Sequence, residues 1–509
     1  MNIILVYPEF PDTFWSFKHA LKFIRKKAAF PPLGLLTLGA MLPQEWDIRL
    51  VDVNVTKLTQ EDLNWADLAF ISAMAVQRAS ARETISLCKK AGLRVVAGGP
   101  LFTSEHEQFP EVDHFVLNEA ELTLPLFLSD LKNDTPKKIY QTKQYADMSQ
   151  TPPPRWELLD MKRYASMSIQ FSRGCPFNCE FCNVTALFGH RTRIKQSRQI
   201  IGELEALYGL GWRGQVFFVD DNFIGNKHYL KQHLLPQLIQ WRSGKKGIRF
   251  NTEASLNLAD DNELMDMMVL AGFDTVFVGI ETPDEGSLAE CRKTQNKNRD
   301  LVRSVKRIQR AGLQVQGGFI VGFDNDTDSI FQRQIDFIQN SGIVTAMVGL
   351  LQAPAGTRLY ERLKQQGRLL GHMSGNTDGT TNIIPKMDLD ILRDGYSTII
   401  RYIYTPKHYY KRIKTFLREY HTPEIPRSVD LQHFLAFFRC SIRLGLIGRE
   451  RFHYWRLLVW TLFRRPASIP LAITLAIYGH HFQRVCNTTS PDQQRIPRVF
   501  TPRCPLSTS

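Results

Sequence analysis

The sequence lacks the features that mark membrane-spanning or disulfide-rich secreted proteins. No apolar run reaches the roughly 20 residues that a helix needs to cross a bilayer, because Arg464-Arg465-Pro466 separates the two most apolar C-terminal stretches. The first ten residues, MNIILVYPEF, lack the charged region and long apolar stretch of a signal peptide. The eight cysteines show no evenly spaced secreted framework. We therefore expect a protein of the reducing cytoplasm.

Acidic residues are scarce in the last fifth of the chain. Of 509 residues with a net charge of +14, 18 basic and 5 acidic side chains follow Ile400. An anionic membrane surface and nucleic acid are two partners for such a region, and a solvated basic face without a partner is the third reading. The length and the 43% apolar content allow two or three domains, each with its own core.

Residues 1–140 alternate short apolar runs with helical patterns, which predicts an α/β, doubly wound (Rossmann-like) domain. Five strands are expected, at 3–7, 48–51, 68–71, 95–97 and 114–117. No GxGxxG motif opens the first helix, so the sequence gives no sign of a dinucleotide site. Ligands of such sheets bind beyond the carboxyl ends of the strands. Those ends carry Ser72, Gly98, Gly99 and Glu119.

Residues 141–164 form a proline-containing linker, and a second alternating series follows over 165–395. Six strands are expected, at 167–171, 215–219, 248–251, 275–279, 315–321 and 346–351. Repeated βα units of this length predict a full or partial barrel with its chemistry at the carboxyl ends of the strands. Polar residues and a glycine recur at these ends: Asp220, Asp221, Glu253, Ser255, Gly279 and Glu281. Taken singly, each such residue is as often a helix cap or a turn.

Three cysteines lie within eight residues directly after the first of these strands. Cys175, Cys179 and Cys182 follow CxxxCxxC spacing, and the nearest other cysteines are Cys88 and Cys291. Three thiolates occupy three corners of a [4Fe-4S] cluster and leave the fourth iron open to an exogenous ligand. A zinc site with His190 as fourth ligand, or a buried thiol cluster, remains open on spacing alone.

The stretch FSRGCPFNCEFC resembles the signature of the radical S-adenosylmethionine (SAM) superfamily. The chain is similar over most of its length to the cobalamin-binding branch, which carries a C-terminal extension and includes enzymes that methylate hopanoid lipids. The resemblance implies a six-unit partial TIM barrel and a cluster whose open iron binds SAM. An electron from the cluster then cleaves the sulfonium and gives a 5′-deoxyadenosyl radical.

The resemblance also implies the site. Cys175, Cys179 and Cys182 would bind the [4Fe-4S] cluster. The barrel residues listed above would contact SAM, and the residues at the end of the first sheet would approach cobalamin. The Asp-x-His-x-x-Gly motif of many cobalamin enzymes is absent, since the corresponding residues read Asp52-Val53-Asn54-Val55-Thr56. If corrin binds, its cobalt should therefore lack a protein histidine. A purely structural flavodoxin-like domain is the other reading.

The resulting hypothesis is an enzyme that methylates an unactivated carbon of a lipid-like or secondary-metabolite substrate, with flavodoxin or ferredoxin as electron donor. The first alternative is radical rearrangement, cyclisation or oxidation without methylation. An alternative of another class, a nucleic-acid-binding module with a metal cluster, rests on the basic C-terminal region alone and is disfavoured.

The C-terminal region, residues 400–486, is basic, aromatic and helical in pattern. Trp, Phe and Leu beside Arg suit a helix lying in a membrane interface, so peripheral association with the membrane's inner face is one expectation. A small helical domain packed on the barrel is the other. Residues 487–509 are rich in proline and polar residues and are expected to be disordered.

Overall fold

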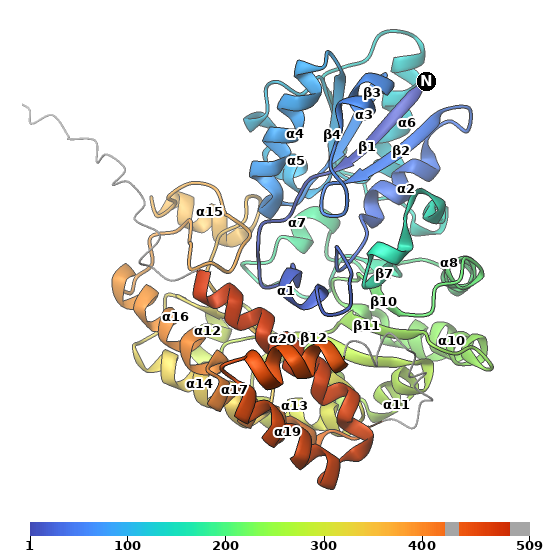
Figure 1. Cartoon of the computed structure of the whole chain (residues 1–509). Coiled ribbons are helices and arrows are strands. Elements are labelled where there is room, and N and C mark those ends of the chain that lie inside the picture. The colour runs from blue at the N-terminus through green and yellow to red at the C-terminus, as the bar shows by residue number, and fades with distance from the viewer. Residues whose placement is uncertain (423–436, 489–509) are drawn as a thin grey trace, which may run out of the picture.

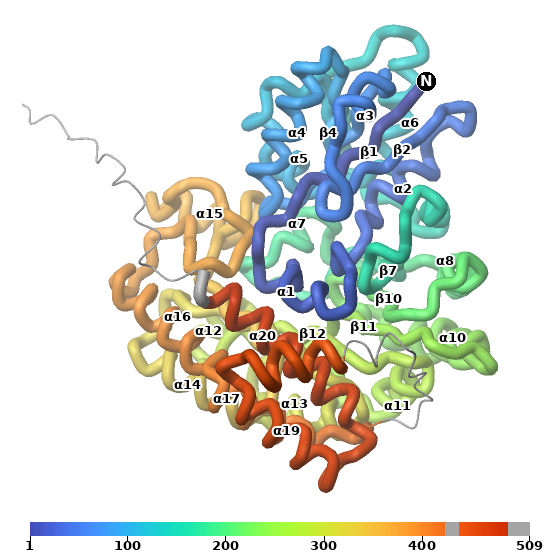
Figure 2. The backbone as a smooth tube through the Cα atoms, in the orientation of Figure 1, coloured from blue at the N-terminus to red at the C-terminus, as the bar shows by residue number. Residues whose placement is uncertain are grey.

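The computed structural model describes residues 1–422 and 437–488 and contains two parallel sheets of six strands (Figures 1 and 2). The N-terminal sheet has the order β2-β1-β3-β4-β5-β6. Its strands are β1 Asn2–Tyr7, β2 Asp47–Asp52, β3 Leu68–Ser72, β4 Arg94–Gly98, β5 His114–Val116 and β6 Ile139–Tyr140. The expectation of five strands was one short, because two residues next to the predicted linker pair with β5.

Helices cover both faces of the N-terminal sheet. Alternate residues of β1, such as Ile3 and Ile4, belong to two separate apolar clusters, one on each face. Buried side chains of α3 (Gln60–Trp65), α4 (Arg78–Lys90) and α5 (Pro100–Glu105) fill one cluster, and those of α2 (Leu33–Met41) and α6 (Ala120–Lys132) fill the other. The sheet is therefore doubly wound, and the order in which the strands are added reverses between β1 and β3, which is where such folds bind ligands.

The second sheet is a partial barrel with the order β14-β13-β12-β11-β10-β7. Its strands are β7 Ser166–Ile169, β10 Gln215–Phe218, β11 Arg249–Glu253, β12 Phe273–Glu281, β13 Gln314–Val321 and β14 Ala346–Leu350. All six lie where the sequence predicts them. The helices between them are α8 Ser197–Gly209, α10 Leu235–Arg242, α11 Asn262–Ala271, α12 Glu285–Glu290, α13 Leu301–Arg310 and α14 Ser329–Ser341. Because β7 and β14 are the two edges, the arc stays open between them.

The two faces of the barrel strands differ in burial. Outward residues such as Val216 and Val276 are fully buried with the helices. Residues that face the inside of the barrel, including Phe217, Glu253 and Phe277, are only partly buried. Glu253 pairs with Phe277 in register, so both lie on the inner face. The barrel thus keeps an accessible inner surface.

A short hairpin carries the cysteine motif. Its strands are β8 Ser172–Arg173 and β9 Arg193–Ile194, and α7 (Val184–Phe188) lies between them. Figure 1 places α7 between the N-terminal sheet and the barrel. The residues that connect the two barrel strands β7 and β10 therefore lie where the two domains meet.

The C-terminal extension packs against helices α13 and α14 of the barrel and against its edge strand β14. It comprises α15 Arg358–Gln365, α16 Leu389–Tyr404, α17 Pro406–Glu419, the π-helix η10 Ser441–Ile447, α19 Arg451–Arg464 and α20 Ile469–Thr488. The predicted start of the helical region, residue 400, lies within α16, which begins at Leu389. α20 lies against α1 (Lys18–Leu21), which belongs to the long β1–α2 connection (Figures 1 and 2). The Phe14 and Phe482 rings stack with centroids 4.2 Å apart.

No helix in the described residues is both long and apolar enough to cross a membrane. The predicted disordered tail lies, from residue 489 on, outside the described residues.

Candidate active site

The three cysteines of the motif lie together in the loop after β8. Gly174, directly before Cys175, has φ +87°, and a Cβ there would lie 2.7 Å from the Arg191 carbonyl oxygen, so the entry to the loop requires glycine. Cys182 N–H donates to the Cys179 carbonyl at 3.3 Å. All three thiols are free; Cys179 is buried, and the other two are partly buried.

Two side-chain amides and the ammonium group of Lys293 face the thiols. Asn222 Nδ2 lies 3.9 Å from Cys175 Sγ, and Gln295 Nε2 lies 3.6 Å from Cys179 Sγ. Burial raises the pKa of Cys182 to about 12, so this thiol stays protonated until a metal ion displaces its proton. Three thiols with amide donors to sulfur form a donor set that fits an iron–sulfur cluster.

Lys293 holds a buried positive charge beside these cysteines. Its Nζ lies 2.7 Å from Glu281 Oε1. Burial alone would lower the pKa of Lys293, but the charges of Glu281 and Cys179 outweigh it, and the pKa rises above its ordinary value. A Cβ on Gly279 would lie 2.8 Å from Nζ, so only glycine leaves room for this ammonium. Glu281 itself has φ +65°, an uncommon conformation at the irregular end of β12.

Asp220 and Asp221, at the end of β10, have different surroundings. The Asp220 carboxylate accepts hydrogen bonds from Phe171 N and from the backbone and side chain of Ser172. It therefore fixes the start of the cysteine hairpin. Asp221 Oδ2 is buried without a hydrogen-bond partner among the described residues. Burial raises the pKa of Asp220 to about 7 and that of Asp221 to about 6.

Glu253 is the last residue of β11, and Ser255 follows it at the same end of the barrel. No described residue forms a hydrogen bond with the Glu253 carboxylate, and its burial, together with the charges of Asp221 and Asp220, raises its pKa to about 8. Ser255 N and Oγ both lie within 3.2 Å of Asn222 Oδ1. The Glu253 carboxylate and Asp221 Oδ2, at the ends of neighbouring strands, are therefore left to accept from the ammonium and hydroxyl groups of a polar ligand.

Sequence reasoning missed Asn222 and Gln295. Asn222 directly follows the predicted Asp220-Asp221 pair, and its polarity at a strand end was the available signal. Gln295 lies in a 3-10 turn after α12 and gave no signal. Lys293 carried no assigned role in the sequence.

At the N-terminal sheet, Ser72, Gly98 and Gly99 come together at the adjacent ends of β3 and β4. Gly99 has φ +87°, and a Cβ there would lie 2.5 Å from Ser72 Oγ. A Cβ on Gly98 would lie 2.5 Å from the Val116 carbonyl oxygen. These close contacts require glycine at both positions, so neither residue projects a side chain at this edge, which is compatible with a bulky planar ligand beyond the strands.

Glu119 lies at the same edge, but its carboxylate is engaged by protein. Arg193 Nη2 lies 2.6 Å from Oε1, and Arg173 Nη1 lies 3.0 Å from Oε2. Both arginines belong to the cysteine hairpin. The predicted cofactor contact of Glu119 did not anticipate this connection between the two domains.

The raised pKa of Glu253 leads to a prediction for the cluster-free protein. Its folded-state pKa of about 8 exceeds the ordinary value of 4.5. This carboxyl therefore costs no stability below about pH 4.5, a growing amount between about pH 4.5 and 8, and a constant amount above about pH 8. Relative to the parent, Glu253→Gln should gain at least about 1 kcal/mol of unfolding free energy between pH 5 and 8, a lower bound since one pKa unit corresponds to about 1.4 kcal/mol.

Urea unfolding at pH 5, 7 and 9 measures this difference. Glu45→Gln, at an exposed carboxylate, is the matched control. Its free energy of unfolding should change with pH as that of the parent does. If the unfolding free energy of Glu253→Gln also changed with pH as that of the parent does, the prediction would be contradicted.

Comparison with known proteins identifies the two domains that meet at this site. Residues 25–128 match the B12 binding domain, residues 169–338 match the radical SAM superfamily, and residues 357–495 match a domain of unknown function, DUF4070. The sequence-based expectation of a cobalamin-binding domain, a radical SAM core and a helical extension is confirmed.

Two curated relatives align over nearly the whole chain. An uncharacterized methyltransferase of Synechocystis is 41% identical over 95% of this chain and 91% of its own length. The hopanoid C-2 methylase of Rhodopseudomonas palustris is 33% identical over 94% of this chain and 92% of its own.

Two solved structures share the fold. The radical SAM methyltransferase TsrM of Kitasatospora setae, with cobalamin and a [4Fe-4S] cluster bound, covers 96% of this chain and 99% of its own, with a TM-score of 0.58 at 14% identity. The cobalamin-dependent radical enzyme OxsB, with aqua-cobalamin and SAM bound, aligns over 96% of this chain and 80% of its own, with a TM-score of 0.55 at 15% identity. The chain therefore belongs to the cobalamin-dependent radical SAM methyltransferase family, together with the hopanoid C-2 methylase.

Proposed function

We propose that this enzyme methylates an unactivated carbon of an apolar, lipid-like molecule held against the inner surface of the partial barrel. The observation that carries the proposal is the aromatic lining of that surface, next to the cysteine loop. Trp15, from the β1–α2 connection, packs edge-on against Phe277 with ring centroids 5.2 Å apart. Phe30, from the same connection, contacts Phe217 at 5.1 Å. Aromatic side chains provide large apolar contact area for such a substrate.

The similarity to the hopanoid C-2 methylase supports a lipid-like substrate. The cover that Trp15 and Phe30 form over Phe277 and Phe217 also suits the chemistry, because radical intermediates need protection from water. When bound, the cofactors supply the substrate radical and the methyl group. The chain's own residues bind and orient these groups, hold the substrate and exclude water. An external low-potential electron donor, such as flavodoxin or ferredoxin, is required, and we place the enzyme in the cytoplasm.

The site residues take the following roles in this proposal. Cys175, Cys179 and Cys182 bind the [4Fe-4S] cluster. SAM contacts fall to Asp221, Glu253, Ser255, Gly279 and Glu281, whereas Asp220 positions the hairpin. The edge formed by Ser72, Gly98 and Gly99 faces cobalamin, and Glu119 positions the cysteine loop through Arg173 and Arg193.

The cysteine assignment predicts a selective loss of cluster. Replacing any one of Cys175, Cys179 or Cys182 by alanine should abolish the absorption near 400 nm, because two thiolates do not hold a cube. Iron per chain and 5′-deoxyadenosine formation should fall to background after anaerobic reconstitution. Cys88→Ala, at a buried cysteine of the N-terminal domain, is the matched control and should retain both. Retention of cluster by a motif variant would refute the assignment.

The aromatic lining predicts that loss of Trp15 uncouples methylation from 5′-deoxyadenosine formation. Trp15→Ala should lower methylated product per 5′-deoxyadenosine roughly tenfold, because a displaced substrate no longer meets the radical in a reactive geometry. Mass spectrometry measures the ratio, with about 14 Da gained per methylation, the mass of CH₃ replacing H. Leu270→Ala, at an exposed leucine of α11, is the control. An unchanged ratio in Trp15→Ala argues against this substrate position, and turnover without mass gain favours rearrangement, cyclisation or oxidation.

We further propose that the enzyme binds the inner membrane surface through η10 and α19. Exposed apolar side chains follow one another along these helices: Ile442, Leu446, Ile447, Phe452, Trp455, Val459, Leu462 and Phe463. Phe463 is 79% exposed and Ile447 is 76% exposed. Over residues 437–488 the chain has eight arginines and a single acidic residue, Glu450, which is buried. Apolar side chains interspersed with arginine suit the interface of an anionic bilayer.

Vesicle sedimentation tests the membrane surface. The enzyme should sediment with vesicles containing phosphatidylglycerol at low salt and less with phosphatidylcholine alone. A triple variant, Leu446→Ser, Phe452→Ser and Phe463→Ser, should bind at least about tenfold more weakly, given the apolar area removed. The matched control is Leu126→Ser with Leu270→Ser, at exposed leucines on other elements. No sedimentation of the parent at low salt would remove the proposal.

A further inference from the structure

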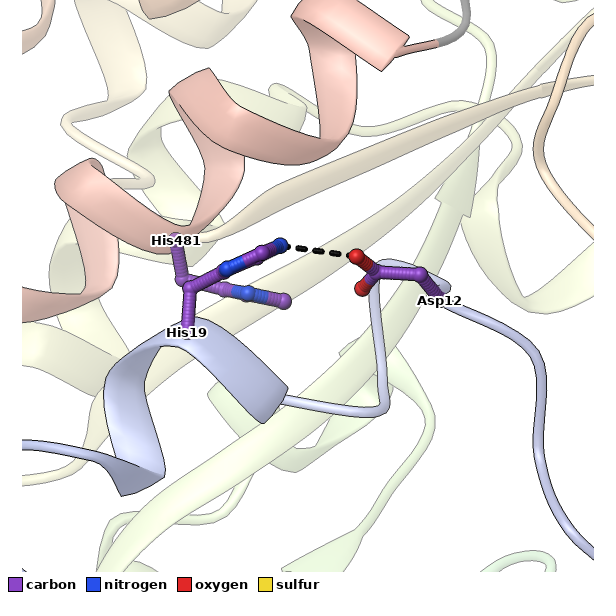
Figure 3. A group of neighbouring side chains, drawn as sticks. All are labelled: Asp12, His19 and His481. Atoms are coloured by element: carbon purple, nitrogen blue, oxygen red, sulfur yellow. Dashed lines mark hydrogen bonds and ion pairs between the residues drawn. The ribbon is translucent and has the colours of Figure 1, made fainter.

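Asp12, His19 and His481 gather where the N-terminal domain meets the C-terminal extension (Figure 3). Asp12 and His19 belong to the β1–α2 connection, and His481 lies on α20, 462 residues further along the chain than His19. One potential ligand atom from each of the three residues lies within 4.8 Å of the others. None of them takes part in the active site described above.

His481 is prepared to bind a cation. Its side chain is completely buried, an environment that favours the neutral ring. Its Nε2 lies 3.1 Å from the Phe14 carbonyl oxygen. A carbonyl only accepts, so Nε2 carries the proton and Nδ1 carries a lone pair. Nδ1 is buried and has no hydrogen-bond partner among the described residues. Histidine ligands of metals characteristically donate their other N–H to a backbone carbonyl in this way.

His19 and Asp12 complete the donor set. His19 Nε2 lies 2.7 Å from Asp12 Oδ2, and their side chains are 23% and 35% exposed. His481 therefore lies on the buried side of the group, and Asp12 and His19 lie on the side that is open to solvent. Two imidazoles, one carboxylate and access for a water molecule are the ligands of a four-coordinate zinc site with three protein ligands. Each ligand atom would need to move by about 1 Å or less to reach bond lengths of about 2.0–2.2 Å.

We propose that Asp12, His19 and His481 bind Zn²⁺, with water as the fourth ligand. The metal ion would join the β1–α2 connection to α20. Trp15, which contacts Phe277 on the inner surface of the barrel, lies between Asp12 and His19 in the sequence. The zinc site therefore holds in place the segment that covers the barrel, and its role is positional.

Zinc analysis of the cluster-loaded enzyme tests the proposal, since a filled cluster occupies the competing thiols. After dialysis against buffered Zn²⁺, the enzyme should retain about one zinc per chain beside its iron. X-ray absorption at the zinc edge should show nitrogen and oxygen neighbours at about 2.0–2.1 Å and no sulfur at about 2.3 Å. Absence of retained zinc, or a sulfur shell, would overturn the proposal.

Variants of the two partly exposed ligands identify the site. Asp12→Asn and His19→Gln should each weaken zinc binding at least about tenfold, with iron content unchanged as the check on folding. His19→Cys should restore binding and introduce one sulfur neighbour at about 2.3 Å. His233→Gln, at an exposed histidine of the barrel, is the matched control. Equal zinc affinity in Asp12→Asn, His19→Gln and the parent would show that Asp12 and His19 form an ordinary ion pair.

Discussion

The relation between the two cofactor-binding domains depends on a buried ion-pair network around Glu119. Glu119 pairs with Arg193 and Arg173, and Arg173 also pairs with Glu121 at 2.8 Å. Burial acts to raise the pKa of Glu121, but the charge of Arg173 outweighs it, and the pKa falls below its usual value. Since unpaired buried charges are costly, the four side chains stay together, and the cysteine hairpin keeps one position beside the N-terminal sheet.

A second set of ion pairs holds the cysteine loop from the opposite side. Glu180, between Cys179 and Cys182, receives Arg362 of α15 at 2.8 Å. Arg362 also reaches Asp324, which pairs with Arg368 at 2.6 Å. Within the loop, Phe181 packs beside Phe323 with ring centroids 6.2 Å apart, against a small apolar cluster. Ion pairs at both ends of the loop add to this packing. They connect the loop to the N-terminal domain and to the C-terminal extension.

The sequence was sufficient for the barrel strands because each shows apolar residues at alternate or consecutive positions, as Met167 and Ile169 do in β7. It was insufficient for β6, since Ile139 and Tyr140 are too short a run to show a period. The sequence did not show the ion pairs of Glu119 or the hydrogen bonds of Asp220, for another reason. Arg193 is 74 residues from Glu119, and Ser172 is 48 residues from Asp220, so only the folded chain shows that these carboxylates are occupied. The grouping of Asp12, His19 and His481 was equally out of reach.

The packing of α20 on the β1–α2 connection also affects the order in which the chain folds. Phe14 emerges early in synthesis and meets Phe482 only after nearly the entire sequence has been made. Contacts of such large sequence separation carry a high loop-closure cost and form late. The two sheets can form during synthesis, as domains do, but the cover over the barrel waits for the last helix. An incomplete chain therefore leaves the barrel uncovered, and a chain truncated before α20 should be poorly protected against side reactions of a radical.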